Sequence, residues 1–218
     1  MIVDRLKFSR RPVIVALIYA MLAFGAQTGI AKSDGIPGCF ANPPTIAADG
    51  TYSISQGSGA CDELGKILQA TNQKDVAWIP GAGLNAILGL GEGGFASNSY
   101  ALQFRVSPRF DELFAGQDEL VRFAPDETRA CGGSWWTTLQ SVTAGNGRFV
   151  SASDLEARLA LPQSSVPRVV AYSSGVALGT VGYFGIVAPA FGRGGGAVQF
   201  WFPSEPVFTK EFKTLPNP

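Results

Sequence analysis

Residues 194–202 read Gly-Gly-Gly-Ala-Val-Gln-Phe-Trp-Phe, a glycine run that leads directly into an alternating segment. Because successive side chains of a β-strand point to opposite faces, Val198, Phe200 and Phe202 share one face of such a strand. This apolar set is a natural core face and predicts a strand that packs on a hydrophobic core. Gln199 then lies on the opposite face, beside the mouth of the glycine loop, where a ligand can approach the backbone closely.

The chain on either side carries further short periodic runs, separated by turns rich in glycine and proline. In one of them, Ser153 followed by Glu156 is a capping-box pattern. The tail from Pro203 is expected to be an extended edge or a disordered end. Together the runs predict an α+β fold, a mostly antiparallel β-sheet with a few short helices. We expect strands over 76–79, 100–106, 119–124, 167–172, 176–181 and 197–202, helices over 61–70, 107–114 and 153–160, and a mobile loop or glycine-rich turn of helix over 81–97.

The overall composition is that of a globular protein: of 218 residues, 46% are apolar and 16% are charged. The length suits one domain, or one and a half, with a single core. The sequence contains no histidine. Ser-His-Asp and Cys-His catalysis, zinc bound by histidine and a histidine-based pH switch are therefore excluded.

Residues 1–31 have the three parts of a secretory signal peptide. A basic stretch is followed by an apolar run from Val13 to Phe24 and then by small residues, with cleavage expected after Gly25 or Ala31. The apolar run is short for a membrane span. We interpret 1–31 as a signal peptide, and the alternative is an uncleaved N-terminal anchor.

Removing this peptide leaves 13 basic and 16 acidic residues, a net charge of −3. A net acidic protein is a poor candidate for non-specific nucleic-acid binding, so no nucleic-acid partner is expected. No other segment is long and apolar enough to cross a bilayer, so the mature protein is expected to be secreted or periplasmic, with no stable membrane span. A soft boundary separates a loop-rich and helical N-terminal module, 32–115, from a C-terminal module, 116–218.

The chain has three cysteines, and export makes a disulfide plausible. Cys39 and Cys61 flank a loop of proline, glycine, serine and asparagine, and we prefer this pairing. Cys131 is then free or buried, although the sequence also permits a bridge between Cys61 and Cys131. Three cysteines without histidine make a poor metal site, so no metal is expected.

Two segments of the C-terminal module carry side chains suited to a ligand. Arg122 lies in the apolar run 120–123, where it either faces solvent or meets an anion such as phosphate. Trp135 and Trp136 point to opposite faces of an extended chain, so one can pack inside while the other faces a cleft. The alternative for this pair is two core anchors.

A third segment is the glycine-rich loop that precedes Gln199. Glycines allow the backbone to approach a ligand and expose N–H groups, although a flexible hairpin loop would have the same composition. The candidate binding residues in this loop are Phe191, Arg193, Gly194, Gly195 and Gly196.

The motif Ala188-Pro-Ala-Phe-Gly-x-Gly-Gly-Gly-x-x-Gln199 resembles that of the secreted NAD glycohydrolases, which include the tuberculosis necrotizing toxin domain, related polymorphic-toxin domains and fungal surface enzymes. An Arg-Phe segment and a Gly-aromatic segment precede it, so the resemblance covers residues 118–203 and makes 116–218 the catalytic module. In that family an arginine, an aromatic residue and the glutamine after the glycine run line the NAD pocket. The resemblance therefore implies that Arg122 and Gln199 are catalytic.

The aromatic residue of the pocket has two assignments. One alignment implies Trp135 or Trp136, whereas a competing alignment of the segment 147–149 implies Phe149, with Arg148 beside it. Two features differ from the family: the histidine of the toxin branch is absent, and Arg193-Gly replaces the usual Gln-Pro in the loop.

This chemistry does not require histidine. The ring nitrogen of NAD+ is already cationic, so nicotinamide leaves as a neutral molecule, and the enzyme must stabilise an oxocarbenium-like ribosyl centre and admit water. The resemblance implies a secreted NAD+ glycohydrolase of the toxin type, with NAD+ as substrate, no cofactor, and an immunity protein as a conceivable partner that the sequence does not identify. The alternatives are ADP-ribosyl transfer to a protein or other acceptor, and a non-catalytic exported binding module.

The signal peptide yields a first prediction. N-terminal sequencing of the protein recovered from the exporting cell's periplasm or medium should place the mature N-terminus between Ala26 and Lys32, because signal peptidase cleaves after small residues that follow the apolar run. Exported protein that still begins at Met1 would contradict cleavage and favour an anchor.

Overall fold

The fold was analysed in a computed structural model of the chain. The structure describes residues 37–46, 52–53, 59–71, 76–115, 119–144, 147–164, 166–203 and 207–215. The predicted signal peptide, 1–31, lies outside the described residues. Internal contacts group Lys32–Pro218 into one compact unit, and the description below concerns that unit.

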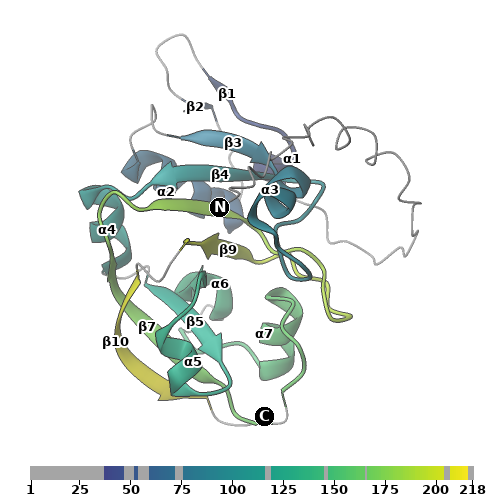
Figure 1. The fold of residues 1–218 in the computed structure, drawn as a ribbon, viewed down its shortest axis with the longest axis vertical. Helices are drawn as coiled ribbons and strands as arrows, with labels where there is room; N and C mark the ends of the chain where they lie inside the picture. The colour runs from purple at the N-terminus through teal and green to yellow at the C-terminus, as the bar shows by residue number, and fades with distance from the viewer. Residues whose placement is uncertain are drawn as a thin grey trace, which may run out of the picture. The chain divides into compact units, whose positions relative to one another are not determined.

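One antiparallel sheet organises the unit, with eight strands in the order β10-β7-β5-β6-β9-β8-β4-β3 (Figure 1). The predicted α+β fold with a mostly antiparallel sheet is confirmed, and the tail forms an extended edge strand, β10. A separate short ladder pairs β1 with β2. The strands are β1 (Thr45–Ile46), β2 (Tyr52–Ser53), β3 (Ala77–Pro80), β4 (Tyr100–Arg105), β5 (Leu120–Ala124), β6 (Trp135–Thr138), β7 (Val169–Val176), β8 (Val181–Ile186), β9 (Val198–Trp201) and β10 (Val207–Thr214).

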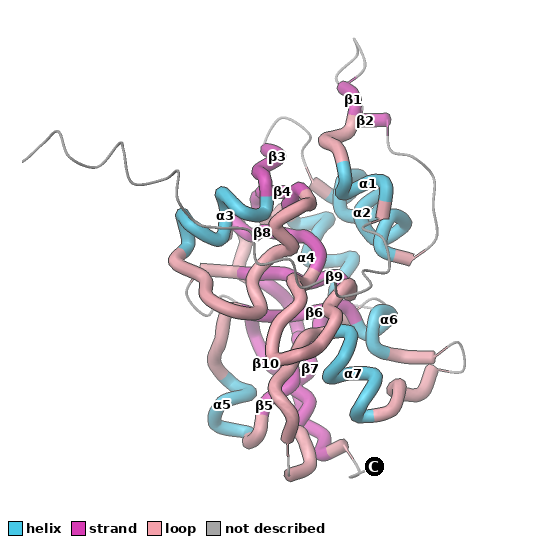
Figure 2. Tube along the Cα trace, turned by 90° about the vertical axis from the view of Figure 1, so that its right-hand side faces the viewer, coloured by secondary structure: helices cyan, strands magenta, loops and turns pink. Residues whose placement is uncertain are grey.

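Short helices cover both faces of the sheet, and Figure 2 shows α3 on one side of β3 and β4 and the α1–α2 pair on the other. Residues of α1, α2 and α4 share the main hydrophobic core with the sheet, whereas α3 and α7 pack in smaller clusters against the opposite face. The helices are α1 (Gly38–Ala41), α2 (Ala60–Ala70), α3 (Gly81–Leu88), α4 (Pro108–Ala115), α5 (Glu127–Cys131), α6 (Leu139–Val142) and α7 (Ala152–Arg158).

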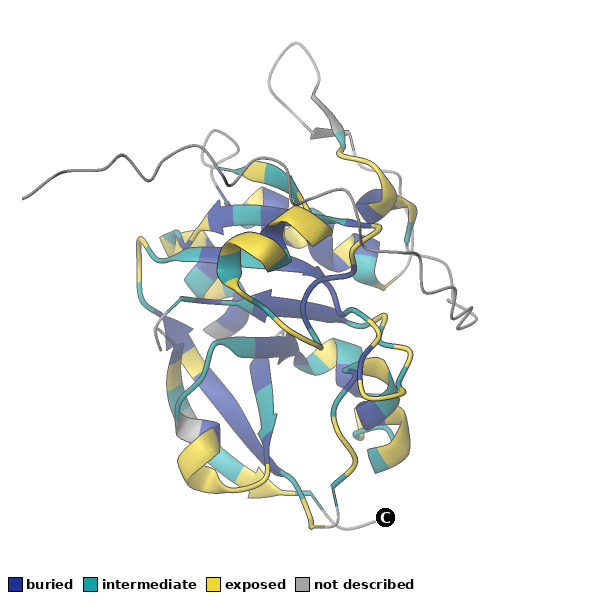
Figure 3. Ribbon diagram, turned by 45° about the vertical axis from the view of Figure 1, so that its right-hand side comes forward, coloured by how far each residue is buried: buried dark blue, intermediate teal, exposed yellow. Residues whose placement is uncertain are grey.

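Phenylalanine rings fill the main core, and Figure 3 shows the central strands as the buried layer. The Phe184 and Phe200 ring centroids lie 4.7 Å apart, and those of Phe104 and Phe110 lie 4.8 Å apart. Val198, Phe200 and Phe202 are all buried in this core. The alternation in the deciding segment therefore predicted its core face correctly.

Strand β6 joins two halves of the sheet. Its second half pairs with β5, through Leu120 opposite Thr138 and Val121 opposite Thr137. Its first half pairs with β9 instead, through Trp135 and Trp136. Each half of this four-residue strand therefore pairs with a different strand, and β6 connects the two parts of the sheet.

The sheet also crosses the predicted module boundary. Strand β4, from the segment 32–115, pairs with β8, from the segment 116–218. The two predicted modules thus share one continuous sheet, because strands from both segments need each other as hydrogen-bonding neighbours.

The strand expected over 176–181 is not formed, because a turn interrupts it. β7 ends at Val176 and β8 begins at Val181. Between them, Gly179 has a φ of +80°, a left-handed conformation that a strand does not contain. The Val106 N–H donates to the Thr180 carbonyl oxygen at 2.8 Å and stabilises the turn.

The helix expected over 153–160 is α7, but the predicted cap is wrong. Ser151 is its N-cap: the Ser151 hydroxyl accepts a hydrogen bond from the Asp154 N–H at 3.1 Å. Glu156, assigned to the capping box by its spacing, is buried and points to a different part of the molecule. Ser151 and Ser153 each precede an acidic residue by three positions, so the local pattern does not distinguish them. The helix begins directly after Ser151, so the Ser151 hydroxyl provides the cap.

The preferred disulfide is confirmed: Cys39 and Cys61 are bonded and tie α1 to α2, with their Cα atoms 5.8 Å apart. Disulfides are typical of exported proteins. Within the described part of the chain, no helix is long and apolar enough to cross a membrane.

The α7 cap can be tested with two serines that lie two residues apart. Ser151→Ala should lower the free energy of unfolding by about 1 kcal/mol, because it removes the acceptor for an orphan N–H of the first turn. Ser153→Ala, at an exposed helical position, should change it by no more than about 0.5 kcal/mol. Urea denaturation of both variants measures the difference. A larger loss of stability in Ser153→Ala than in Ser151→Ala would instead assign the cap to Ser153.

Candidate active site

A cavity of about 260 Å³ lies where β5 and β6 separate. The two strands are paired only as far as Val121 and Thr137, and the next residues of each strand line the cavity instead of continuing the ladder. The sheet therefore opens beside the tryptophan pair. The cavity is lined by Glu92, Gly93, Val121, Arg122, Phe123, Trp135, Trp136, Thr137, Leu159, Ala160, Leu161, Pro162, Phe191 and Gln199.

Arg122 bridges this opening. Its Nη1 donates to the Trp135 carbonyl oxygen at 3.1 Å, and its Nε donates to the Arg129 carbonyl oxygen at 3.3 Å. The guanidinium thus satisfies a β6 carbonyl at the point where the ladder has opened, which a buried backbone group requires. Arg122 is half-buried in the cavity wall, so the interpretation as a fully solvent-facing strand residue is not supported.

Gly133 makes room for that guanidinium. A Cβ atom at this position would lie 2.1 Å from Cζ of Arg122, and the glycine has a φ of +146°. Only a residue without a side chain fits there in this conformation. Gly133 therefore provides the space that the Arg122 guanidinium occupies.

The two tryptophans pack in different hydrophobic clusters on opposite faces of the sheet, as strand alternation predicted. Trp136 is 3% exposed, belongs to the main core and donates from Nε1 to the Gly133 carbonyl oxygen at 3.1 Å. Trp135 is half-buried, and its ring lies 5.6 Å from that of Phe95 between centroids. Both line the cavity, and Trp135 presents the more accessible indole.

Gln199 lines the cavity from β9, on the face opposite the core. It is only 6% exposed and is therefore a buried polar side chain that needs a hydrogen-bond partner. Its Nε2 donates to the Gly94 carbonyl oxygen at 3.0 Å. Because that partner can only accept, the amide orientation is determined, and Oε1 is the atom left to accept a hydrogen bond from a ligand.

The glycine run does not line this cavity. The Gly195 N–H donates to the Ala157 carbonyl oxygen at 2.9 Å, and the Gly196 N–H donates to the Val187 carbonyl oxygen at 3.1 Å. A Cβ on Gly195 would lie 2.5 Å from the oxygen of Val187. Gly195 thus lets the loop pack closely on Val187, and hydrogen bonds of Gly195 and Gly196 join the loop to α7 and to the residue after β8 in place of the predicted ligand cradle.

Phe191, in contrast, does reach the cavity, from the tip of a tight turn. Ala190 and Arg193 exchange backbone hydrogen bonds of 3.2 and 2.8 Å across Phe191 and Gly192. Phe191 has a φ of +51° and is 51% exposed. Ala160 has a φ of +46°, and these two are the non-glycine residues with positive φ within the described ranges. Both line the same cavity, and such backbone strain concentrates at functional sites.

The remaining candidates lie elsewhere. Arg148 is exposed and outside the cavity lining. Phe149 is half-buried and packs against a small hydrophobic cluster, with its ring 5.9 Å from Phe123 and 6.5 Å from Tyr172 between centroids. The tryptophan alignment thus names residues that line the cavity, whereas the alignment on 147–149 names residues that do not. Arg193 lies in a second cavity.

Several cavity residues escaped the sequence analysis. Glu92 and Gly93 come from the loop after α3, and Leu161 and Pro162 come from the segment after α7. Glu92 is the acidic residue of the glycine-rich run 89–94, and a charged residue in such a run is the signal that could have identified it. Nothing in the local sequence marks the other three, because they reach the cavity only through the packing of distant segments.

The lining is aromatic and apolar, with one guanidinium, one primary amide and one carboxylate. The hydroxyl of Thr137 donates to the Val198 carbonyl oxygen at 2.8 Å and so is engaged in the sheet. Among the residues that the structure describes, no cluster of acidic residues or cysteines could hold a metal ion. The site can stack an aromatic ring, pair with an anionic group and hydrogen-bond hydroxyl groups.

The comparisons with known proteins identify no relative. No protein-family model matches the chain, and neither a curated protein nor a solved structure matches it significantly. The interpretation of the site therefore depends on its geometry and on the motif.

The close approach of Gly133 and Arg122 predicts a coupling between the two positions. Gly133→Ala should destabilise the protein by about 1–3 kcal/mol, since the added methyl overpacks the site. In an Arg122→Ala background, the clash disappears and only the backbone strain remains, so the same change should cost about 1 kcal/mol less. Denaturant melts of the four proteins measure this coupling.

Gly194 provides the matched control, since a Cβ there meets nothing within 4 Å. Gly194→Ala should cost the same in both backgrounds. Equal costs of Gly133→Ala in the two backgrounds would contradict the contact with Arg122.

Proposed function

We propose that this protein is an exported NAD+ glycohydrolase, which cleaves the nicotinamide–ribose bond to give nicotinamide and ADP-ribose. The observation that carries the proposal is the convergence of Arg122, Trp135 and Gln199, from three separate strands, on one cavity. The resemblance to the NAD glycohydrolases implies the same combination of an arginine, an aromatic residue and a glutamine. Export is supported by the N-terminal sequence pattern and by the disulfide.

The cavity suits the nicotinamide end of the dinucleotide. Its volume of about 260 Å³ is below the range of roughly 300–1,000 Å³ that is usual for complete ligand pockets. The rest of the substrate would then lie outside it. In our proposal, the indole of Trp135 stacks on the cationic nicotinamide ring, and Arg122 pairs with a diphosphate oxygen at the edge of the opening.

Cleavage requires that the ribosyl cation be stabilised and that a water molecule reach C1′. The C1′–N bond breaks with both electrons moving to the nicotinamide nitrogen, a water oxygen bonds to C1′, and that water releases a proton. Gln199 Oε1 would accept a hydrogen bond from a ribose hydroxyl. The Glu92 carboxylate, which lines the same cavity, would stabilise the positive charge that develops on the sugar.

ADP-ribosyl transfer is the second candidate, and Glu92 is the observation that favours it. Transferases that modify side chains usually use a glutamate to take a proton from the acceptor, and Gln199 cannot act as a base. Glu92 lines the same cavity and could serve an acceptor other than water. Incubation with labelled NAD+ and a protein extract distinguishes the two reactions, because hydrolysis leaves the label in free ADP-ribose whereas transfer moves it to protein.

Gln199→Ala tests the proposal. The variant should lose nicotinamide release by on the order of 100-fold or more, because it removes an interaction with the transition state. It should also be less stable by about 1–2 kcal/mol, because the Gly94 carbonyl loses its buried donor. Rates are therefore measured well below the melting temperature, and circular dichroism verifies the fold.

Gln103→Ala is the matched control: Gln103 is a half-buried glutamine of strand β4, outside the cavity lining. It should retain full activity. A folded Gln199→Ala protein that releases nicotinamide as fast as Gln103→Ala would contradict the role of Gln199. Absence of nicotinamide release from the parent protein would contradict the proposed function itself.

A further inference from the structure

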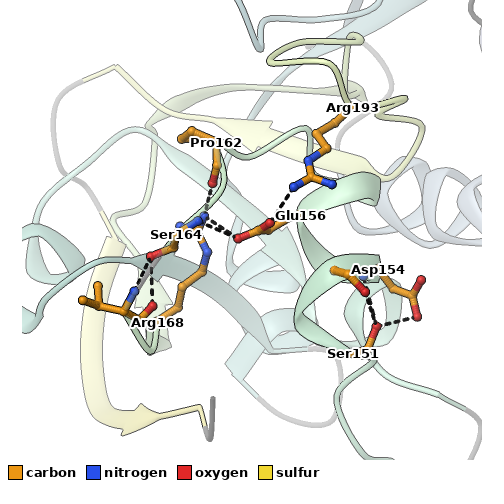
Figure 4. Close-up of polar contacts among 9 residues, drawn as sticks. Ser151, Asp154, Glu156, Pro162, Ser164, Arg168 and Arg193 are labelled. Carbon is orange, nitrogen blue, oxygen red and sulfur yellow. Dashed lines mark hydrogen bonds and ion pairs between the residues drawn. The ribbon is translucent and has the colours of Figure 1, made fainter. Parts of the chain in front are cut away.

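A second cavity, of about 290 Å³, lies between the start of α7, residues 163–164 and 166–168, and the loop that carries Arg193. Figure 4 shows Arg168 and Arg193 reaching the same glutamate from opposite sides. The polar residues of its lining are Ser153, Glu156, Gln163, Ser164, Arg168 and Arg193. This cavity is no part of the site described above.

Glu156 is the buried centre of this cluster, with its side chain 9% exposed. Its Oε1 accepts from the Ser164 N–H at 3.0 Å and from Nη2 of Arg168 at 3.3 Å. Its Oε2 accepts from Nη2 of Arg193 at 2.9 Å. Both oxygens of the carboxylate are therefore occupied, and the two guanidiniums leave one positive charge in excess.

Arg193 holds that excess charge where a ligand can meet it. Its side chain is 28% exposed, whereas that of Arg168 is 10% exposed. Arg193 uses one of its terminal nitrogens for Glu156, and within the described ranges its other side-chain nitrogens have no hydrogen-bond partner. A guanidinium anchored by a carboxylate on one side presents its remaining donors in a defined direction, which suits a phosphate or carboxylate.

Two segments of the chain contribute residues to both cavities. Phe191 lines the first cavity, and Arg193, on the other side of the same turn, lines the second. Pro162 lines the first, Gln163 lines the second, and Arg168 donates to the Pro162 carbonyl oxygen from the second side. Phe191 and Pro162 are therefore the first-cavity residues that lie nearest along the chain to the polar lining of the second cavity.

We propose that the second cavity is a phosphate subsite, in which Arg193, held by Glu156, binds a phosphate group of the dinucleotide whose nicotinamide end occupies the first cavity. The assignment of the dinucleotide rests on the proposed function, whereas phosphate binding by Arg193 does not. The phosphate has two chemical sources: the diphosphate that joins the two nucleosides, and the 2′-phosphate of the phosphorylated dinucleotide NADP+.

Direct binding tests the subsite without any turnover. Adenosine 5′-diphosphate and adenosine 2′-monophosphate are titrated separately into the parent protein, Arg193→Ala and Arg109→Ala by calorimetry. Arg109 is an exposed arginine of α4 outside both cavities and provides the same charge change. Arg193→Ala should weaken binding by about tenfold or more, the loss of one charge-assisted hydrogen bond, and Arg109→Ala should leave it unchanged. The ligand with the stronger dependence on Arg193 identifies the source of the phosphate.

Two variants separate binding from a purely structural clamp. Arg193→Lys keeps the charge and should bind more tightly than Arg193→Ala but more weakly than the parent. Glu156→Gln removes the competing negative charge and should bind the adenosine phosphates more tightly than the parent, even if it melts at a lower temperature. If Glu156 and the two arginines form only a structural clamp, both variants should be less stable than the parent, and the parent should bind neither adenosine phosphate.

The steady-state kinetics of dinucleotide cleavage provide the last test of the subsite. Arg193→Ala should raise KM for NAD+ or NADP+ while kcat changes little, because Arg193 does not touch the reacting atoms. If neither adenosine phosphate binds the parent, or if Arg193→Ala binds both as the parent does, the subsite is refuted even where NAD+ is cleaved. If both bind through Arg193 but nicotinamide is never released, the proposed function fails and the subsite remains.

Discussion

The guanidinium of Arg122 spans the point where strands β5 and β6 separate, and the candidate site depends on this contact. A sheet that opens in its interior leaves backbone carbonyls without ladder partners, and burial makes such groups costly. Arg122 satisfies the Trp135 carbonyl from the side, and Gly133 leaves the space that the guanidinium occupies. The cavity exists because a side chain replaces the missing strand-to-strand bond.

One face of the sheet carries the main hydrophobic core, and the loops that line the candidate site lie on the other face. On one face, the phenylalanine core with α1, α2 and α4 anchors the strands, and the disulfide fastens α1 to α2. The opposite face carries smaller clusters under α3 and α7, and the loops after both helices contribute to the cavity. A rigid core behind adaptable loops is a common arrangement for a binding site.

Buried polar contacts position those loops. The Gln199 amide ties the loop after α3 to β9 through the Gly94 carbonyl. Glu156 ties α7 to Arg193 and to the segment around Ser164. Because each of these buried groups has partners on a different segment, the cavity walls are held by interactions that need the complete fold.

Sequence periodicity alone determined the local features of this protein. The α+β class, the core face of Val198 and Phe200, and the division of Trp135 and Trp136 between opposite faces of the sheet all follow from the spacing of apolar residues, which is a local property. The pairing of Cys39 with Cys61 was also the preferred choice, because the two residues flank one short loop.

Only the tertiary structure decided which residues meet. The order of the strands, the opening beside Arg122 and the arrival of Glu92 at the same cavity depend on contacts between segments far apart in the chain, which no local pattern encodes. The same holds for the glycine run, in which the N–H groups of Gly195 and Gly196 donate to the carbonyl oxygens of Ala157 and Val187 and are therefore not available to a ligand. It also holds for Glu156, whose spacing suggested a helix cap but whose burial between two arginines made it the centre of a second cavity. A backbone or carboxylate group takes the partner that folding brings to it, and that partner is determined by the whole chain.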